Sequence, residues 1–144
     1  KIKTIIKKKN LIFVKKFKLK FYKNESSTIK FLKKRKLGLG LITTASKERI
    51  NSTIPIIFLN QFNIILTREN IKFNKPNPEI YLKALSSLKI KNKECLAIEN
   101  SPNGILAAKK AKIKTIAVTH TLSKKHLSNA DIIIDDLKVL KKII

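Results

Sequence analysis

The chain has 144 residues, a hydrophobic fraction of 43% and a formal net charge of +24, values that suit one domain with one hydrophobic core. Its single cysteine excludes an intrachain disulfide and a cysteine-based metal cluster. The longest apolar runs, of about six residues, are far shorter than the roughly 20 that span a bilayer. The N-terminus has neither the apolar core nor the small-residue cleavage site of a signal peptide. We therefore expect a cytoplasmic protein with no membrane partner.

The positive charge does not by itself indicate a nucleic-acid-binding protein. Only three basic residues are arginines, although arginine is the residue that binds phosphate and guanine bidentately. Lysine, isoleucine and asparagine are abundant, and all three have AT-rich codons, so mutational bias accounts for the composition. A polyanion-binding surface stays open as an alternative, but we expect no specific nucleic-acid partner.

The first regular pattern follows a basic N-terminal segment of poor periodicity, residues 1–25. Ser26, Ser27 and Thr28 predict the cap of a helix that runs to about Lys36. Residues 37–42 predict a buried strand, in which two glycines indicate close approach by another backbone. Further along, Ser46 predicts the cap of a helix over residues 47–52, and residues 62–66 predict a second strand.

The second half of the chain begins with a strong helix start. Asn77, Pro78 and Glu79 supply a cap, a proline for the first turn and an acid near the positive end of the helix dipole. The elements predicted after this helix are a strand over 95–98, a helix from Ser101 to about Ala111, a strand over 115–118, a short helix over 124–127, a strand over 132–134, and a closing helix over 137–144 capped by Asp135 and Asp136.

Strands thus alternate with helices, and most of the strands are wholly apolar. This pattern indicates a parallel sheet covered by helices on both faces, a three-layer α/β fold. In such sheets the chemistry lies at the carboxyl ends of the strands. The polar residues expected at those ends are Thr43, Thr44, Thr67, Glu99, Asn100, Thr119 and His120, and Lys75 precedes a helix on the same side.

Three segments carry a resemblance to a known family. They are LGLITTASKE at 39–48, a hydrophobic strand that ends in threonine; KPNPEIYL at 75–82, a lysine followed by a helix start; and CLAIENSPNGI at 95–105, a strand that ends in an acid. Together with ADIIIDDL at 130–137, they resemble the haloacid dehalogenase (HAD) superfamily. The closest branch is that of beta-phosphoglucomutase and phosphoglycolate phosphatase. The resemblance covers residues 26–144 and implies a Rossmann-like core.

The resemblance implies a Mg²⁺-dependent phosphatase or phosphomutase that acts on a small phosphorylated metabolite through an aspartyl phosphate in the full-length parent. Thr43, with Thr44 as the alternate, would donate to the phosphoryl oxygens, and Lys75 would neutralise their charge. Glu99 and Asn100 take the positions of the family's acidic metal-binding pair. Because Asn100 is an amide where the family has aspartate, we expect weak Mg²⁺ binding.

The largest departure from the family concerns the nucleophile. The family's Asp-x-Asp motif follows its first strand, upstream of every segment matched above, whereas the only aspartates here are Asp131, Asp135 and Asp136. We therefore expect a core that lacks the first strand and most of the cap domain, with residues 1–25 as a candidate cap remnant.

Such a chain would be inactive alone. It would be a fragment, a decayed gene product, or one piece of a split enzyme whose N-terminal half another chain supplies. The alternative is a non-catalytic remnant or a basic polyanion-binding protein. Neither the substrate nor the choice between phosphatase and mutase follows from this sequence.

Overall fold

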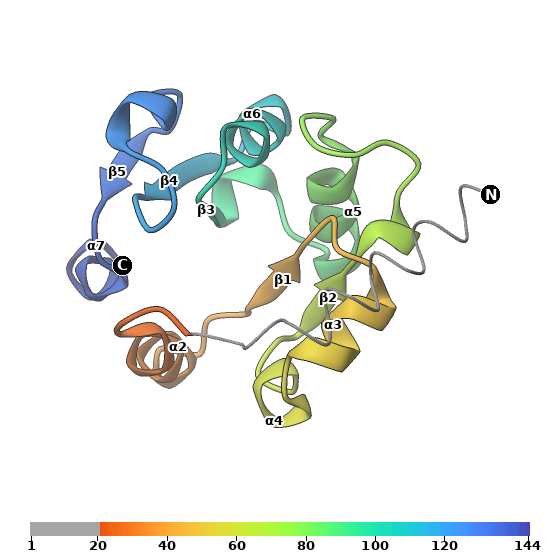
Figure 1. Ribbon diagram of the computed structural model, residues 1–144, viewed down its shortest axis with the longest axis horizontal. Helices are drawn as coiled ribbons and strands as arrows, with labels where there is room; N and C mark the ends of the chain where they lie inside the picture. The colour runs from red at the N-terminus through yellow and green to blue at the C-terminus, as the bar shows by residue number, and fades with distance from the viewer. Residues whose placement is uncertain (1–20) are drawn as a thin grey trace.

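The computed structural model describes residues 21–144, so most of the candidate cap remnant lies outside the described residues. In the described part, five strands form two parallel sheets (Figure 1). One sheet pairs β1 (Gly40–Ile42) with β2 (Ile64–Leu66). The other has the order β3-β4-β5, from β3 (Leu96–Glu99), β4 (Lys114–Val118) and β5 (Ile132–Ile134).

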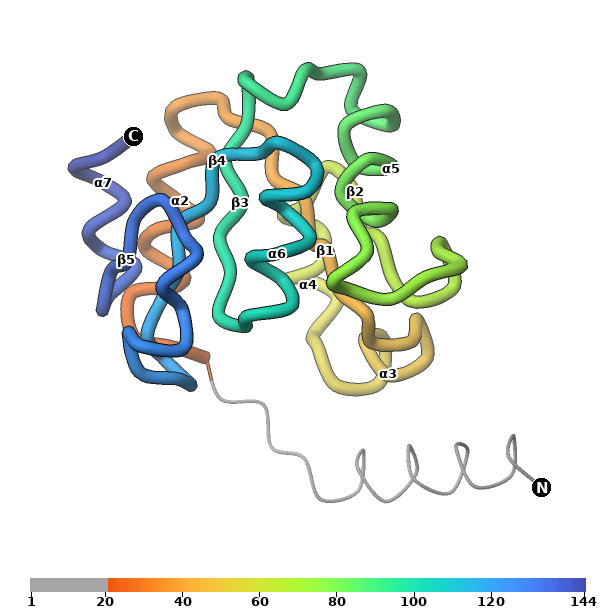
Figure 2. The backbone as a smooth tube through the Cα atoms, turned by 90° about the horizontal axis from the view of Figure 1, so that it is seen from above, coloured from red at the N-terminus to blue at the C-terminus, as the bar shows by residue number. Residues whose placement is uncertain are grey.

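Helices lie on both sides of the strands, which confirms the predicted α/β architecture (Figures 1 and 2). The α-helices are α2 (Glu25–Lys34), α3 (Lys47–Thr53), α4 (Ile56–Leu59), α5 (Glu79–Leu88), α6 (Pro102–Lys110) and α7 (Leu140–Ile143). Helix α5 packs on β1 and β2, α6 packs on β3 and β4, and α2 contacts α7. Short 3-10 turns cover Arg68–Asn70, Asn92–Glu94, Lys124–His126 and Leu137–Val139.

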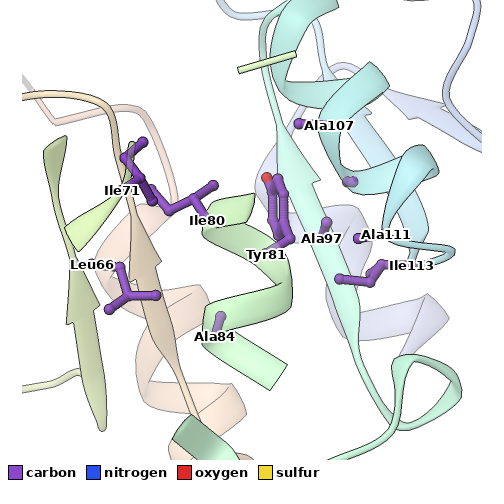
Figure 3. Close-up of a cluster of buried hydrophobic side chains, with 10 residues drawn as sticks. Leu66, Ile71, Ile80, Tyr81, Ala84, Ala97, Ala107, Ala111 and Ile113 are labelled. Atoms are coloured by element: carbon purple, nitrogen blue, oxygen red, sulfur yellow. The ribbon is translucent and has the colours of Figure 1, made fainter. Parts of the chain in front are cut away.

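The hydrophobic core has one main cluster beneath α5 and α6 (Figure 3). Its members are Leu66, Ile71, Ile80, Tyr81, Ala84, Ala97, Ala107, Ala108, Ala111 and Ile113. The alanines on α6 bring that helix close to the sheet, and burial of a side chain such as Ile80 contributes about 1.5–3 kcal/mol. A second cluster joins Leu140 of α7 to β4 and β5.

The helix starts agree with the sequence at most positions. Ser46, Ser101 and Asp136 each accept a backbone N–H bond of the first turn that follows them, and the side chain of Asn77 accepts the N–H of Glu79. The predicted cap at residues 26–28 is wrong, because α2 begins at Glu25. Glu25 accepts the N–H of Tyr22, which closes the first turn earlier than the serine pattern suggests.

Two strand predictions extend too far toward the amino end. The predicted strand over 37–42 is reduced to β1, Gly40–Ile42, and the strand over 62–66 begins only at Ile64. The amide of Leu39 donates to the side chain of Asn63 at 2.8 Å instead of to a strand backbone. Helix α4 was not predicted, because its four residues are all apolar and give no amphipathic pattern. In the structure its Ile56 and Ile57 are 70% and 78% exposed.

Between the two sheets lies a cavity of about 780 Å³. Leu37, Gly38 and Leu39 line it on the β1 side, and Leu96 and Ile98 line it on the β3 side. A second cavity, of about 110 Å³, lies between β1 and β3 against α5. None of the helices in residues 21–144 is long and apolar enough to cross a membrane.

Candidate active site at the carboxyl ends of β1 and β3

A buried ion pair joins the two sheets at their carboxyl ends. Lys75 Nζ lies 2.5 Å from Oε1 of Glu99, and the two side chains are only 11% and 8% exposed. Glu99 is the last residue of β3, whereas Lys75 comes from the loop before α5. The same Nζ lies 3.4 Å from the carbonyl oxygen of Ile42, the last residue of β1. Lys75 therefore bridges β1 and β3.

Tyr81 of α5 is the second donor to Glu99. Its hydroxyl donates to Glu99 Oε1 at 2.5 Å, and the Lys75 ammonium lies 5.0 Å from its ring centroid. Figure 3 shows the Tyr81 ring standing between α5 and β3. Burial, and then the neighbouring Glu99 carboxylate, raise the pKa of the Tyr81 phenol, so it stays a proton donor at neutral pH.

The first turn of α6 accommodates the other oxygen of Glu99. Oε2 accepts two long hydrogen bonds, from the backbone amide of Asn100 at 3.3 Å and from the Ser101 hydroxyl at 3.4 Å. A Cβ atom at Gly104 would lie 2.0 Å from that oxygen, so any larger residue there would displace the Glu99 carboxylate. Gly104 thus allows the carboxylate to lie over the helix start, a closer approach than general helix–sheet packing requires.

Glu79 holds the loop that carries Lys75. Its carboxylate accepts the backbone amides of Phe73 at 2.8 Å and Lys72 at 2.9 Å. These two bonds are the main reason that the pKa of Glu79 falls from 4.5 to about 2. The proline that follows Lys75 is joined to it by a cis peptide bond. The bonds to Glu79 therefore tie the amino end of this loop to the start of α5.

Thr43 directly follows β1, at the same end of the sheet. Its amide donates to the carbonyl of Leu66, and its hydroxyl oxygen accepts the amide of Ala45 at 3.1 Å. A hydroxyl has one hydrogen of its own, which is left to donate to a ligand. Thr43 is half-buried and Thr44 is exposed.

The acidic pair expected to bind metal fits Mg²⁺ poorly. Lys75 and Tyr81 already engage Glu99, and Asn100 is an exposed neutral amide. Residues 21–144 contain no group of three or more His, Cys, Asp and Glu side chains arranged to hold a metal ion. A hard cation prefers several carboxylate oxygens and water, so these residues alone do not make a complete magnesium site.

The structure brings some of the predicted site residues together and leaves others apart. Lys75 and Glu99 are in direct contact, and Thr43 follows the residue whose carbonyl Lys75 approaches. Asn100 adjoins Glu99 through its backbone only. The sequence analysis did not include Tyr81 among the candidate site residues. A phenol on an otherwise aliphatic helix face needs a hydrogen-bond partner, and that signal could have identified it.

The fold and this geometry define the class of protein. Thr43 and Glu99 lie at the carboxyl ends of parallel strands, and Lys75 reaches them from a loop, so the polar site lies where α/β proteins bind their ligands. The family model described as haloacid dehalogenase-like hydrolase matches residues 1–118. The chain belongs to this family, which confirms the resemblance seen in its motifs.

Curated relatives agree with that assignment. The chain is 30% identical over 107 residues to validoxylamine A 7'-phosphate phosphatase from Streptomyces hygroscopicus subsp. limoneus, a match that covers 74% of this chain and 50% of that protein. It is also 30% identical over 112 residues to pyrophosphatase PpaX from Anoxybacillus flavithermus, covering 76% and 52% respectively. The chain therefore spans about half the length of these relatives.

Solved structures share the fold. Beta-phosphoglucomutase from Clostridium difficile superposes with a TM-score of 0.70 at 28% identity, covering 80% of this chain and 50% of that one. CbbY from Rhodobacter sphaeroides superposes with a TM-score of 0.83 at 24% identity, covering 94% and 64%. The second match supports the fold alone.

Proposed function

We propose that this chain is the phosphoryl-binding part of a HAD-type phosphatase or phosphomutase that acts on a small phosphorylated metabolite in the cytoplasm. The observation that carries the proposal is the buried Lys75–Glu99 pair, which spans the carboxyl ends of β1 and β3. Burial of an ion pair stabilises a fold little, so a lysine held there by a pinned loop points to a role in binding.

The proposed roles follow from the contacts. Lys75 Nζ makes one short bond, to Glu99, and two long ones, to Ile42 and Tyr81 at 3.4 and 3.5 Å. Bonds that long are weak, so a phosphoryl oxygen could replace them without breaking the ion pair. The free hydrogen of Thr43 and the exposed hydroxyl of Thr44 would donate to the same group. Charge on the phosphoryl oxygens would then meet a fixed cation and neutral donors.

These residues do not supply a nucleophile. Glu99 is occupied by Lys75 and Tyr81, and the three aspartates lie in the last strand region, where Asp131 and Asp136 bond to the backbone amides of Thr115 and Lys138. We propose that an aspartate from outside residues 1–144 forms the phosphoryl-enzyme intermediate, and that the chain by itself is inactive. Another chain that carries this aspartate would complete a split enzyme.

Binding of inorganic phosphate tests the proposed role of Lys75. Phosphate titrated into ¹⁵N-labelled chain should shift the amide signals of residues 43–45 saturably. Lys75→Met should weaken this binding at least about tenfold, because a charge-assisted bond is worth about 1.5–3 kcal/mol. Lys72→Met removes an equal charge from the same loop and should leave the affinity unchanged. Equal weakening by both variants would mean that the affinity for phosphate depends only on the net charge of the chain.

Hydrolysis tests the missing nucleophile. The purified chain, incubated with Mg²⁺ and a panel of sugar phosphates, should release no phosphate above the rate of the Lys75→Met variant. Turnover near about 1 per second, within the ordinary range of enzymes, that disappears in Lys75→Met would show that a residue of this chain replaces the aspartate.

A further inference from the structure

The charged residues are divided between the two ends of the strands. The loops after α2, α5 and α6 lead into the amino ends of β1, β3 and β4, and they lie together at the top of Figure 2. We call their surface the amino-end face and define it by six exposed lysines: Lys36, Lys91, Lys93, Lys110, Lys112 and Lys114. In the described part of the chain none of these lysines forms an ion pair. Their charges are therefore available to an external anion.

Acidic residues do little to neutralise this face. Of the nine acids in the chain, only Glu94 and Asp131 belong to loops at the amino ends of strands. Glu94 accepts the backbone amide of Lys91 at 2.6 Å. Asp131 pairs with Lys109 and accepts the amide of Thr115. The other seven acids follow strands or lie in the first turns of helices, at the opposite end of the domain.

Three of the six lysines are held side by side by the strand pairing. Leu96, the first residue of β3, lies opposite Lys114, the first residue of β4. Asn92 donates to the carbonyl of Lys112 at 3.0 Å, so the turn before β3 is tied to the turn before β4. Lys93, Lys112 and Lys114 all line the cavity of about 780 Å³. Fixed turns thus present these three charges together.

Two simpler causes account for only part of this arrangement. Helix dipoles favour cations at the carboxyl ends of helices, and α2 and α6 have lysines in their last turns. Lys93, Lys112 and Lys114, however, lie outside the α-helices. AT-rich codons raise the number of lysines, but they do not place seven of the nine acids at the other end. The separation of charge is therefore a property of the fold.

We propose that the amino-end face binds the phosphate backbone of duplex nucleic acid without reading its sequence. A duplex carries one negative charge per about 1.7 Å of its axis, and lysines contact phosphates as point charges. A single strand would need exposed aromatic rings on which its bases stack. Among the described residues the exposed aromatic side chains are Phe21, Tyr22 and Phe73, which precede α2 and α5 instead of following them.

A bilayer surface fits this face less well than a duplex. Interfacial binding needs an apolar face that enters the boundary between headgroups and acyl chains. Leu37 and Leu96 are partly exposed, but they line the cavity, which leaves Ile143 near this face. The amino-end face also lies at the end of the strands opposite Lys75 and Glu99. The inference is therefore independent of the proposed function.

The salt dependence of binding tests the proposal. The probe is a fluorescein-labelled DNA duplex of about 20 base pairs, titrated with the chain between about 50 and about 300 mM NaCl. Six phosphate contacts predict that the logarithm of the association constant falls against the logarithm of the salt concentration with a slope of about −5. The triple variant Lys93→Gln, Lys112→Gln, Lys114→Gln should reduce that slope by about 3 and weaken binding at least about tenfold.

A matched variant separates this face from the net charge. Lys47→Gln, Lys124→Gln and Lys125→Gln together remove the same charge from exposed positions that follow β1 and β4, and they should leave the slope unchanged. Equal losses of slope in the two triple variants would overturn the proposal. The duplex should also shift the amide signals of residues 91–94 and 110–114 in ¹⁵N-labelled chain. Shifts confined to other residues would overturn it as well, and this measurement needs no variant.

Two further probes test the choice of a duplex. One is single-stranded DNA of the same length, and the other is vesicles of phosphatidylcholine with phosphatidylserine. At equal phosphate concentration and equal salt, we expect the duplex to bind most tightly. Tighter binding to the single strand or to the vesicles, with the same dependence on Lys93, Lys112 and Lys114, would show that the partner is not a duplex and would overturn the proposal.

Discussion

Lys75 Nζ and Glu99 Oε1 lie 2.5 Å apart at a point where two sheets meet without sharing a hydrogen bond between strands. Because Lys75 Nζ also approaches the carbonyl of Ile42, the pair links the carboxyl ends of β1 and β3. The Tyr81 hydroxyl donates to the same carboxylate oxygen of Glu99. Its geometry depends on α5, on α6 and on the loop that Glu79 pins.

Removal of Lys75 should destabilise the fold. Lys75→Met leaves a buried carboxylate without its cation and should lower the free energy of unfolding by about 3 kcal/mol. Adding Glu99→Gln to that variant should recover part of the loss, because an amide needs no counter-charge. Urea denaturation with an unchanged m-value measures both effects. A single variant as stable as the wild type would show that the pair contributes nothing to the fold.

Gly104 should be sensitive to the smallest substitution. The methyl group of Gly104→Ala would lie 2.0 Å from Glu99 Oε2, so the carboxylate must leave its place over α6 and away from Lys75. We expect a loss of about 1–3 kcal/mol, typical of overpacking, and weaker phosphate binding. Gly38→Ala is the control, because the nearest atom to its Cβ is 3.8 Å away. Equal melting temperatures for the two variants would contradict the close approach.

Asn100 should determine whether the chain responds to magnesium. Wild-type protein should melt at the same temperature with Mg²⁺ or with EDTA, since its acidic pair is incomplete. Asn100→Asp adds a carboxylate beside Glu99, and Mg²⁺ at about ten times its Kd would then stabilise the variant by about 1.4 kcal/mol. Calorimetry with Mg²⁺, and with Na⁺ at matched ionic strength, distinguishes binding from screening. Saturable stabilisation of the wild type would refute the expectation.

The stabilisation that Glu79 gives to the loop carrying Lys75 should decrease at low pH. The pKa of Glu79 is 4.5 unfolded and about 2 in the folded chain. A depressed folded pKa means that its stabilisation is complete above pH 4.5 and is lost as the pH falls toward 2. The stability advantage of wild type over Glu79→Gln should therefore shrink across that window. Glu48 is an exposed acid on α3, and Glu48→Gln is the control. A difference in stability between wild type and Glu79→Gln that does not change with pH would argue against the bonds from Glu79 to Lys72 and Phe73.

Polyanion binding should be weak and without sequence preference. The basic residues are mostly lysines, which contact phosphates as point charges and do not read bases. Labelled duplexes of two unrelated sequences should bind equally, with a Kd of about 10⁻⁴–10⁻⁶ M near physiological salt. Tight binding to one of them would favour the polyanion-binding alternative.

The sequence predicted the elements that local rules govern. Ser46 caps the helix that it was expected to cap, the helix predicted from Ser101 has Ser101 as its cap, and β5 occupies the residues predicted for it. In each case the decisive contact lies within a few residues. The lysine motif and the acidic strand end were likewise recognised from short patterns, and their meeting followed from the parallel order of the strands.

The remaining features depend on neighbours that are distant in the chain. Leu37 and Leu39 look like strand residues, but the amide of Leu39 donates to the side chain of Asn63, and only its carbonyl accepts a backbone amide, that of Asn63. Tyr81 reads as a core residue until Glu99, 18 positions later, is brought beside its hydroxyl. The functional assignment of all five site residues stays a prediction: Thr43, Thr44, Lys75, Glu99 and Asn100.

Within residues 21–144 no further strand pairs with the facing edges of β1 and β3, and this bears on how copies of the protein behave toward one another. Unpaired strand edges template the addition of further strands, the first step of aggregation. The net charge of +24 opposes that step through mutual repulsion, which acts over about 10 Å at 0.1 M salt but only about 3 Å at 1 M. The excess of positive charge thus also opposes self-association of the protein, and concentrated salt removes this protection.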